Sequence, residues 1–431
     1  MLFKNIDLLD GNLDFQAHQW VGVKDGVIDC IGDGAPDNAE AYGEVYDGEG
    51  KLLLPAFYNA HAHAPMTLLR GYAENLPLQA WLNEKCWPFE GKMTAEDNYW
   101  GTLLACAEMA RYGVVSFSDM YYHTDERVRA VDEAGMKMNV CESELFFEEK
   151  PFSEYAIAAK MDEYVKKYHG ALGGRILVDY NIHAEYTSNE VTCRDIAAAV
   201  KDAGLRMHLH LSETKSEHEE CKGRHNGMTP AAYFASIGVF DVPTTAAHCV
   251  WCDDDDLKIL MEHGVSAALN PASNMKLGSG FAPVTKMLEQ GVSVALGTDG
   301  MASNNNHDMF QDLYLMALLS KGYLNDPTAV TPKQALSAAT RGGALAQGRE
   351  DCGKVAVGMK ADLMVVDTAG PSWHPMTDPL MNVVYAGHGS DVVLTLCDGA
   401  VVYRDGEWPG IDVERVKAEC TQRTQRIISE L

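Results

Sequence analysis

Two histidines separated by one residue, His61 and His63, follow a run of aliphatic residues in the segment LLLPAFYNAHAHAPM. In an extended strand, residues i and i+2 point to the same side, so both imidazoles reach one point at the strand's end. Two convergent imidazoles are typical ligands of a divalent metal ion. Such a pair also arises by chance in a chain with 15 histidines among 431 residues, so the surrounding residues decide its meaning.

Further histidines and acidic residues lie at the ends of other apolar segments. They are His183, His208, His210, Glu213, His248 and Asp299. One such histidine alone is more simply a hydrogen-bonded core residue, but together they mark the ends of several predicted strands. We therefore predict a metal site of imidazole and carboxylate ligands, which suit Zn²⁺ and, as a second choice, Fe²⁺. Because zinc lowers the pKa of a bound water to about 7, the expected chemistry is hydrolytic.

The elements that must position these residues are short apolar runs that alternate with helical segments. The eight runs span 52–63, 113–122, 136–145, 175–186, 205–213, 244–250, 265–273 and 292–300. Amphipathic segments between them, such as 95–113 and 189–204, close with glycine as helices often do. This alternation predicts an α/β protein with a parallel (β/α)8 TIM barrel. Barrel enzymes build their sites at the carboxyl ends of the strands, where the candidate ligands fall.

The two ends of the chain have a different pattern, with short β-like runs and Asp-Gly turns. Neither end holds enough strands to close a sheet alone, so we expect both to pair in one small flanking β-sandwich. The predicted domains are 1–54, the N-terminal part of the sandwich, and 55–352, the barrel. Residues 353–431 form its C-terminal part and a terminal helix.

Composition excludes several classes of function. A net charge of −27 argues against binding to nucleic acid or an anionic membrane, which need clustered Lys and Arg. Residues 1–15 lack the pattern of a secretory signal or transit peptide, and no long uninterrupted apolar stretch predicts a membrane span. The 11 cysteines, an odd and scattered number, favour reduced thiols in a cytoplasmic protein.

Five ordered motifs, NAHAH, MHLHLSET, AHCV, NPASNMKLGSG and LGTDGMASNNN, resemble those of the amidohydrolase superfamily. More narrowly, they are similar to the branch of methylthioadenosine/S-adenosylhomocysteine deaminases and their chlorohydrolase relatives. The resemblance extends over nearly the whole chain and includes the terminal element KVAVGMKADLMVVD. It implies a hydrolase that acts on carbon–nitrogen bonds of cyclic amidines.

The resemblance also implies roles for the residues of the metal site. Its metal ligands would be His61, His63, His210 and Asp299. Because the fourth strand, RILVDYNIHAEY, has no lysine to bridge two ions, we expect one metal. His208 is then either a residue that supports a ligand or a core histidine.

Five more roles follow from the resemblance. Glu213 would shuttle protons to a ring nitrogen, His248 would orient the attacking water, and Asp299 would accept a proton from that water. Glu90 would bind the ribose hydroxyls and His183 would contact the nucleoside. The alternatives are a surface carboxylate for Glu90 and a packing role for His183.

The expected function is hydrolytic deamination of an adenine nucleoside to the inosine analogue and ammonia. We expect 5′-methylthioadenosine, 5′-deoxyadenosine or adenosine to be favoured over S-adenosylhomocysteine. The segment CESELFFEEKPFSEY, 141–155, is acidic where relatives that bind the homocysteine carboxylate place arginines. The same segment leaves open a cationic or amine-bearing substrate.

Other functions also stay open at this point. One is hydrolysis of another aminated heterocycle, such as guanine, cytosine, a pterin or an s-triazine. Another is an inactive barrel that serves as a binding subunit, although it would have no reason to keep every catalytic residue. Relatives are often homo-oligomers, so a homo-oligomer is compatible with the resemblance.

Overall fold

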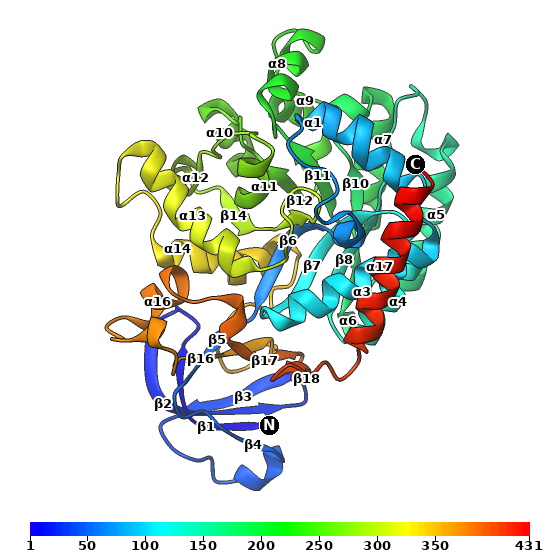
Figure 1. Cartoon of the computed structure of the whole chain (residues 1–431). Coiled ribbons are helices and arrows are strands. Elements are labelled where there is room, and N and C mark those ends of the chain that lie inside the picture. The colour runs from blue at the N-terminus through cyan, green and yellow to red at the C-terminus, as the bar shows by residue number, and fades with distance from the viewer.

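The computed structural model describes residues 1–431 and has eight strand positions arranged in a closed barrel, with helices outside it (Figure 1). The barrel strands are β6 (Phe57–His63), β7 (Val114–Tyr121), β8 (Lys137–Glu142), β9 (Ile176–Val178) followed by β10 (Tyr180–Ile182), β11 (Met207–Leu211), β12 (Thr244–His248), β13 (Ser266–Leu269), and β14 (Ser293–Leu296) followed by β15 (Asp299–Gly300). All neighbouring pairs are parallel.

The barrel closes through its fourth and eighth strands, each of which is divided into two short segments. β9 pairs with β8 and β10 pairs with β11, so the fourth strand joins two sheets. In the eighth strand, the Gly297 N–H donates to Leu269 O at 2.8 Å, and the Thr298 N–H donates to His61 O at 3.2 Å. Successive residues therefore bond to the seventh and the first strand, and this confirms the predicted barrel.

The barrel strands are buried on both faces, as parallel strands covered by helices must be. Every residue of β7 and β8 is buried. The helices of the barrel and its loops are α1 (Leu78–Trp81), α2 (Trp87–Glu90), α3 (Ala95–Arg111), α4 (Thr124–Ala134), α5 (Ala156–Tyr168), α6 (Ala171–Gly174), α7 (Glu190–Ala203), α8 (Lys215–Arg224), α9 (Pro230–Ser236), α10 (Asp254–Glu262), α11 (Pro271–Lys276), α12 (Val284–Gln290), α13 (Met309–Leu324), α14 (Pro332–Ser337) and α15 (Gly343–Ala346).

Local sequence explains where α3 begins and where α7 begins and ends. Thr94 and Asp97 form a reciprocal capping box at the start of α3. The Asn189 side chain accepts from the Thr192 N–H at the start of α7, and Gly204 ends that helix with a φ of 64°. Both helices lie where their periodicity predicts them.

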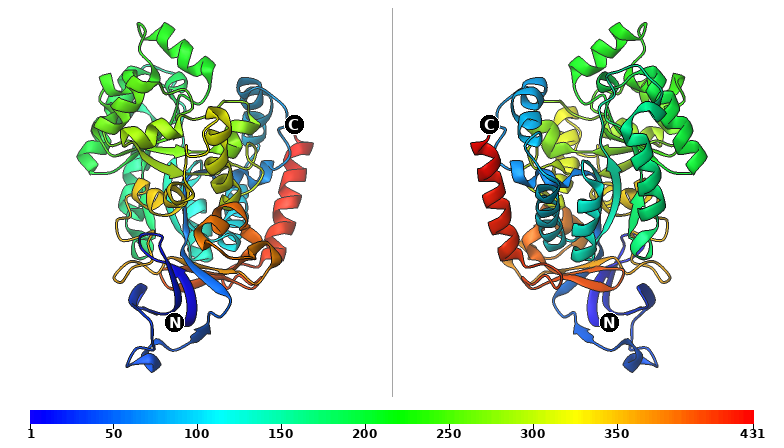
Figure 2. Two further views of the ribbon diagram at one scale, coloured as in Figure 1. Left: turned by 90° about the vertical axis from the view of Figure 1, so that its left-hand side faces the viewer. Right: turned by 90° about the vertical axis from the view of Figure 1, so that its right-hand side faces the viewer.

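The two ends of the chain form one flanking β domain at the amino end of the barrel, as Figure 2 shows from both sides. Its strands are β1 (Leu2–Leu9), β2 (Phe15–Lys24), β3 (Val27–Gly32), β4 (Val45–Asp47), β5 (Lys51–Pro55), β16 (Leu363–Asp367), β17 (Val392–Cys397) and β18 (Ala400–Arg404). They join in one continuous sheet in which β5 of the N-terminal part pairs with β16 of the C-terminal part. The predicted β domain built from both termini is confirmed, and the domain boundaries at 54 and 352 stay predictions.

Alternation along the central strands gives this sheet two apolar faces. Leu53 of β5 and Val365 of β16 belong to a small core of 13 buried residues within the β domain. Leu52 and Val366, their immediate neighbours in the chain, belong to the large core of the barrel. The sheet is therefore fused to the barrel through one face and stabilised by its own core on the other.

The C-terminal segment returns to the barrel. α16 (Pro379–Tyr385) precedes β17, and α17 (Val413–Ser429) lies along α3 (Figure 1). The buried Asp97 carboxylate of α3 pairs with Arg423 at 2.9 Å and with Arg426 at 2.5 Å. All 11 cysteines are free thiols, and none of the helices combines the length and hydrophobicity that a bilayer crossing requires. The cytoplasmic location stays a prediction.

A buried ion pair joins the barrel to the β domain. Lys137, at the start of β8, is 2% exposed and contacts the fully buried carboxylate of Asp362. Its ammonium also lies 2.8 Å from Asp398 Oδ1, and the Tyr58 hydroxyl donates to Asp362. Removal of the ammonium would leave a carboxylate buried without a countercharge.

We expect Lys137→Met to lower the free energy of unfolding by about 3–5 kcal/mol, because it leaves the Asp362 carboxylate buried without its lysine partner. Denaturant unfolding of the variant and the wild type measures the difference. The matched control is Lys258→Met, whose lysine is 65% exposed and 3.8 Å from Glu262, and it should change stability by less than about 1 kcal/mol. Equal stability of the two variants would contradict a role for the buried pair.

Candidate metal and catalytic site

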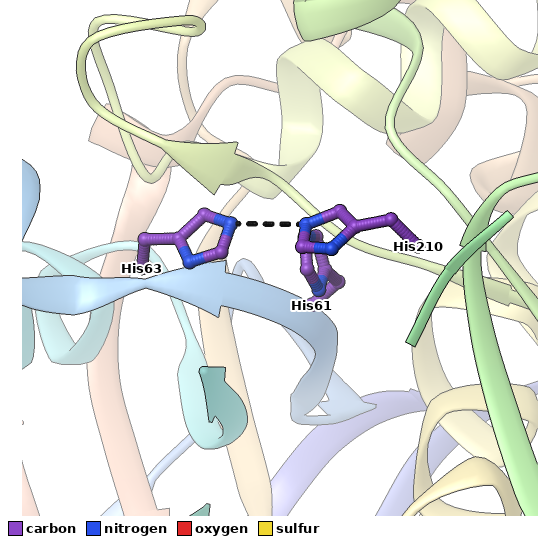
Figure 3. A group of neighbouring side chains, drawn as sticks. All are labelled: His61, His63 and His210. Carbon is purple, nitrogen blue, oxygen red and sulfur yellow. Dashed lines mark hydrogen bonds between the residues drawn. The ribbon is translucent and has the colours of Figure 1, made fainter. Parts of the chain in front are cut away.

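The predicted metal ligands converge at the carboxyl end of the barrel. His61 and His63 alternate along β6, His210 lies on β11, and Asp299 begins β15. Asp299 Oδ1 lies 3.4 Å from His61 Nε2 and 3.2 Å from His63 Nε2. His210 Nε2 is 3.4 Å from His63 Nε2, and Figure 3 shows these two rings facing each other with His61 beside them.

Each ligand ring is oriented by a partner on its other nitrogen. His63 Nδ1 lies 2.6 Å from Met120 O, and His210 Nδ1 lies 2.7 Å from His183 O. Because carbonyl oxygens only accept, these Nδ1 atoms carry protons, and the Nε2 atoms are the ones that face the shared centre. Such outer hydrogen bonds are typical of metal-binding histidines.

The carboxylate and the remaining ring are held in the same way. Asp299 Oδ2 accepts from Ser273 Oγ at 2.6 Å and from Ser303 Oγ at 2.9 Å, which leaves Oδ1 to face the histidines. His61 Nδ1 lies 2.9 Å from His208 Nε2. His208 is buried one layer deeper on β11, so of its two interpretations the structure favours the residue that supports a ligand.

A direct test of the metal hypothesis is whether the buried donors are satisfied without a cation. His61 is fully buried, and its Nε2 has no hydrogen-bond partner. Burial also lowers the pKa of His61 to about 4, so its imidazole is neutral, the form that ligates a metal. The ligand atoms of His61, His63 and His210 all lie within 4.8 Å of one another. These residues therefore fit a single divalent metal ion.

The two predicted proton-transfer residues lie beside this centre. His248, the last residue of β12, has its Nε2 4.0 Å from Glu213 Oε2. His248 Nδ1 lies 2.9 Å from Asn274 Oδ1, which orients the ring. Burial raises the pKa of Glu213, and Ser279 Oγ donates to its Oε1 at 3.4 Å. A carboxyl group with a raised pKa beside a metal centre is suited to donate and accept protons.

Glu90 and His183 line the same pocket as the metal and proton-transfer residues. Glu90 Oε1 accepts from the Tyr121 hydroxyl at 2.7 Å, and burial raises the pKa of Glu90 to about 7. His183 Nδ1 lies 2.9 Å from Thr187 Oγ1, and burial lowers the pKa of His183 to about 3. All eight predicted residues thus lie in or directly beneath one pocket, while their individual roles stay predictions.

Several residues that support or line the site were not identified from the sequence. Ser273, Asn274 and Ser279 belong to the motif NPASNMKLGSG, which carried the resemblance but no residue roles. Trp81 lies in the segment between β6 and α3, is 6% exposed, and its Nε1–H has no partner. Because Trp81 lines the pocket, this donor is available to a ligand. A tryptophan among apolar residues carries no signal of this in the sequence.

Comparisons with known proteins agree with this geometry. The profile of the amidohydrolase family matches residues 52–402. A 5-methylthioadenosine/S-adenosylhomocysteine deaminase of Acetivibrio thermocellus is 41% identical over 433 residues, 99% of each chain. A 5′-deoxyadenosine deaminase of Methanothermobacter thermautotrophicus is 43% identical over 365 residues, 84% of each chain. The solved structure of an adenosine deaminase from Xanthomonas campestris with bound zinc is 29% identical, with a TM-score of 0.92 over 99% of this chain and 98% of that one.

We expect zinc, added to protein stripped with a chelator, to raise the melting temperature by about 5 °C or more, because a ligand that binds only the folded state stabilises it. His210→Ala removes a donor and should abolish this shift. His263→Ala, at a side chain 32% exposed at the end of α10, is the matched control and should keep it. Thermal unfolding with and without zinc measures the effect, and an equal shift in both variants would contradict the ligand assignment.

Proposed function

From the premise that this chain belongs to the amidohydrolase family, we propose that it is a metal-dependent deaminase of adenine nucleosides. The observation that carries the hydrolytic chemistry is the buried Glu213 carboxyl beside His248 and the four predicted ligands. The nucleoside class is supported by relatives at 41% and 43% identity that are named as deaminases of such nucleosides. These names favour adenine nucleosides over the other aminated heterocycles.

One metal ion would be held by His61, His63, His210 and Asp299. When bound, the ion supplies the Lewis acidity that makes a water molecule nucleophilic near neutral pH. Zinc is favoured over iron because the relative from Xanthomonas campestris, 29% identical, contains bound zinc.

The chain's own residues then move the protons. Asp299 Oδ1 accepts a proton from the attacking water, and His248 Nε2 orients that water toward the ring carbon that carries the amine. Glu213 protonates the neighbouring ring nitrogen as the new carbon–oxygen bond forms. A proton from Asp299 passes to the departing amine, which leaves as ammonia, and the new hydroxyl group returns a proton to Glu213 as the carbonyl forms. The net reaction replaces the exocyclic amine by a carbonyl oxygen and consumes one water.

Substrate binding is assigned to Glu90 and His183. Glu90 accepts hydrogen bonds from the ribose hydroxyls, and its free oxygen Oε2 has no partner within the protein. His183, which lines the same pocket, contacts the nucleoside. We further propose that 5′-methylthioadenosine, 5′-deoxyadenosine or adenosine is favoured over S-adenosylhomocysteine, since no arginine lines the pocket or the cavity beside it.

The direct test is ammonia release from a panel of 5′-substituted adenosines and free bases by zinc-loaded protein. Glu213→Gln keeps the shape of the side chain but removes its proton transfer, so we expect kcat to fall by about 100-fold or more. The control is Glu219→Gln, at a 56% exposed side chain of α8, which should behave as the wild type. Wild-type turnover by Glu213→Gln with intact metal content would rule out its proposed role.

Glu90→Ala tests ribose recognition. Because a hydrogen bond to a charged group contributes about 1.5–3 kcal/mol, we expect kcat/KM for adenosine to fall by about 10- to 100-fold. Activity on free adenine, which has no ribose, should change little. If kcat/KM for adenosine is the same in the variant and the wild type, the ribose assignment is wrong.

A further inference from the structure

A second cavity of about 440 Å³ adjoins the catalytic pocket. The two share five lining residues, Trp87, Glu90, Tyr121, Tyr122 and Ser143. We call this second cavity the side chamber. Glu90 lies at the junction of the two cavities. If the ribose binds Glu90, as proposed above, the side chamber is the neighbouring cavity that can receive the 5′ substituent.

The wall of the side chamber offers hydrogen-bond acceptors that lack donors. Asn98 of α3 is 1% exposed, its Nδ2 donates to Thr94 O at 2.9 Å, and its Oδ1 has no partner. The bond from Nδ2 determines which end of the amide accepts. Glu90 Oε2 also accepts no hydrogen bond from the protein, since Tyr121 donates to Oε1, but this oxygen is accessible to solvent. A buried acceptor without a donor is unfavourable, so a ligand that donates hydrogen bonds would be stabilised here.

The charges around the side chamber are predominantly negative. Glu90, Glu142 and Glu144 line it, and Lys160 is the one Lys or Arg that does. Glu142 is largely compensated, because it accepts from the Thr124 N–H at 2.8 Å and lies 3.6 Å from Arg127. Glu144 and Glu90, whose pKa of about 7 leaves it partly ionised at neutral pH, face the single Lys160. The exposed His123 is the only imidazole on the wall.

The pKa of the Tyr122 hydroxyl depends on the electrostatic potential at the wall of the side chamber. Burial raises the pKa of Tyr122, and the carboxylates of Glu90, Glu144 and Glu142 raise it further because they oppose a phenolate. Glu90 and Glu144, with a smaller contribution from Glu142, thus act on one point of the wall. An anionic group would be repelled there, and a cationic group would be attracted.

We propose that the side chamber selects a 5′ substituent that carries an ammonium group. The preferred substrates are then 5′-deoxyadenosines with a short aminoalkyl thioether, with Glu144 as a specificity-determining residue and Asn98 as an acceptor for the ammonium. This inference rests on the proposed deamination of adenine nucleosides, and it assigns the chemistry of the group beyond the ribose.

The proposal is tested with three thioethers of 5′-deoxyadenosine. Their substituents, aminopropyl, butyl and carboxyethyl, differ mainly in charge. We expect kcat/KM for the aminopropyl compound to exceed that for the butyl compound by about tenfold or more, the effect of one hydrogen bond between charged groups. The carboxyethyl compound should be the poorest of the three. Added salt should reduce the advantage of the amine.

Two variants connect this preference to the side chamber. Glu144→Gln removes one carboxylate from its wall and should lower the aminopropyl-to-butyl ratio by about threefold or more. Glu148→Gln is the matched control on the same loop, since Glu148 is 76% exposed, pairs with Lys150 and lies outside the chamber. That variant should keep the wild-type ratio.

The outcomes separate this inference from the proposed function. Deamination of all three thioethers at similar rates, or a preference for the carboxyethyl compound, would overturn the ammonium preference and leave the deaminase assignment intact. A ratio that Glu144→Gln and Glu148→Gln change equally would also overturn the role of the side chamber. Failure to deaminate any adenine nucleoside would overturn both.

Discussion

Four ligand atoms face one another at the carboxyl end of the barrel, three from buried residues and one from the partly buried His63, and the site depends on this arrangement. Imidazole lone pairs and a carboxylate oxygen this close together, removed from water, are poorly satisfied by one another. The protein holds them there through outer partners, such as Met120 O on His63 and the two serine hydroxyls on Asp299. The site is thus preorganised for a cation, and the surrounding fold supplies the energy that preorganisation requires.

Backbone conformation contributes to the same preorganisation. Ser212, His248, Cys249 and Asp299 all have positive φ, between 48° and 75°, at the carboxyl ends of their strands. Each such residue costs about 1–3 kcal/mol and persists only where surrounding bonds enforce it. Here the Cys249 N–H donates to Leu211 O at 2.9 Å, and the Trp251 N–H donates to Ser212 O at 3.0 Å. Parallel barrel strands therefore stabilise turns that are unfavourable in isolation.

The pocket combines two kinds of support. The metal ligands and His248 stand on barrel strands and Glu213 lies two residues after β11, while Trp81 and Glu90 come from the short helices between β6 and α3. Rigid strand ends suit chemistry that needs exact distances, and a separate covering segment can vary with the substrate. The side chamber lies where this cover meets the loop after β8, so the proposed preference for an ammonium group is independent of the catalytic residues.

The sequence by itself determined the elements and the chemical types of the site. Periodicity and glycine placement predicted the strands, α3 and α7, because these signals are local. The alternation of His61 and His63 likewise predicted a shared side, since two-residue periodicity is a property of any strand.

Only the tertiary structure decided which atoms meet. His208 contacts His61, and Asn274 orients His248, although the members of each pair are far apart in sequence. Trp81 Nε1 and Asn98 Oδ1 lack partners only because the fold buries them. No local pattern encodes such contacts, because they arise only when the barrel closes.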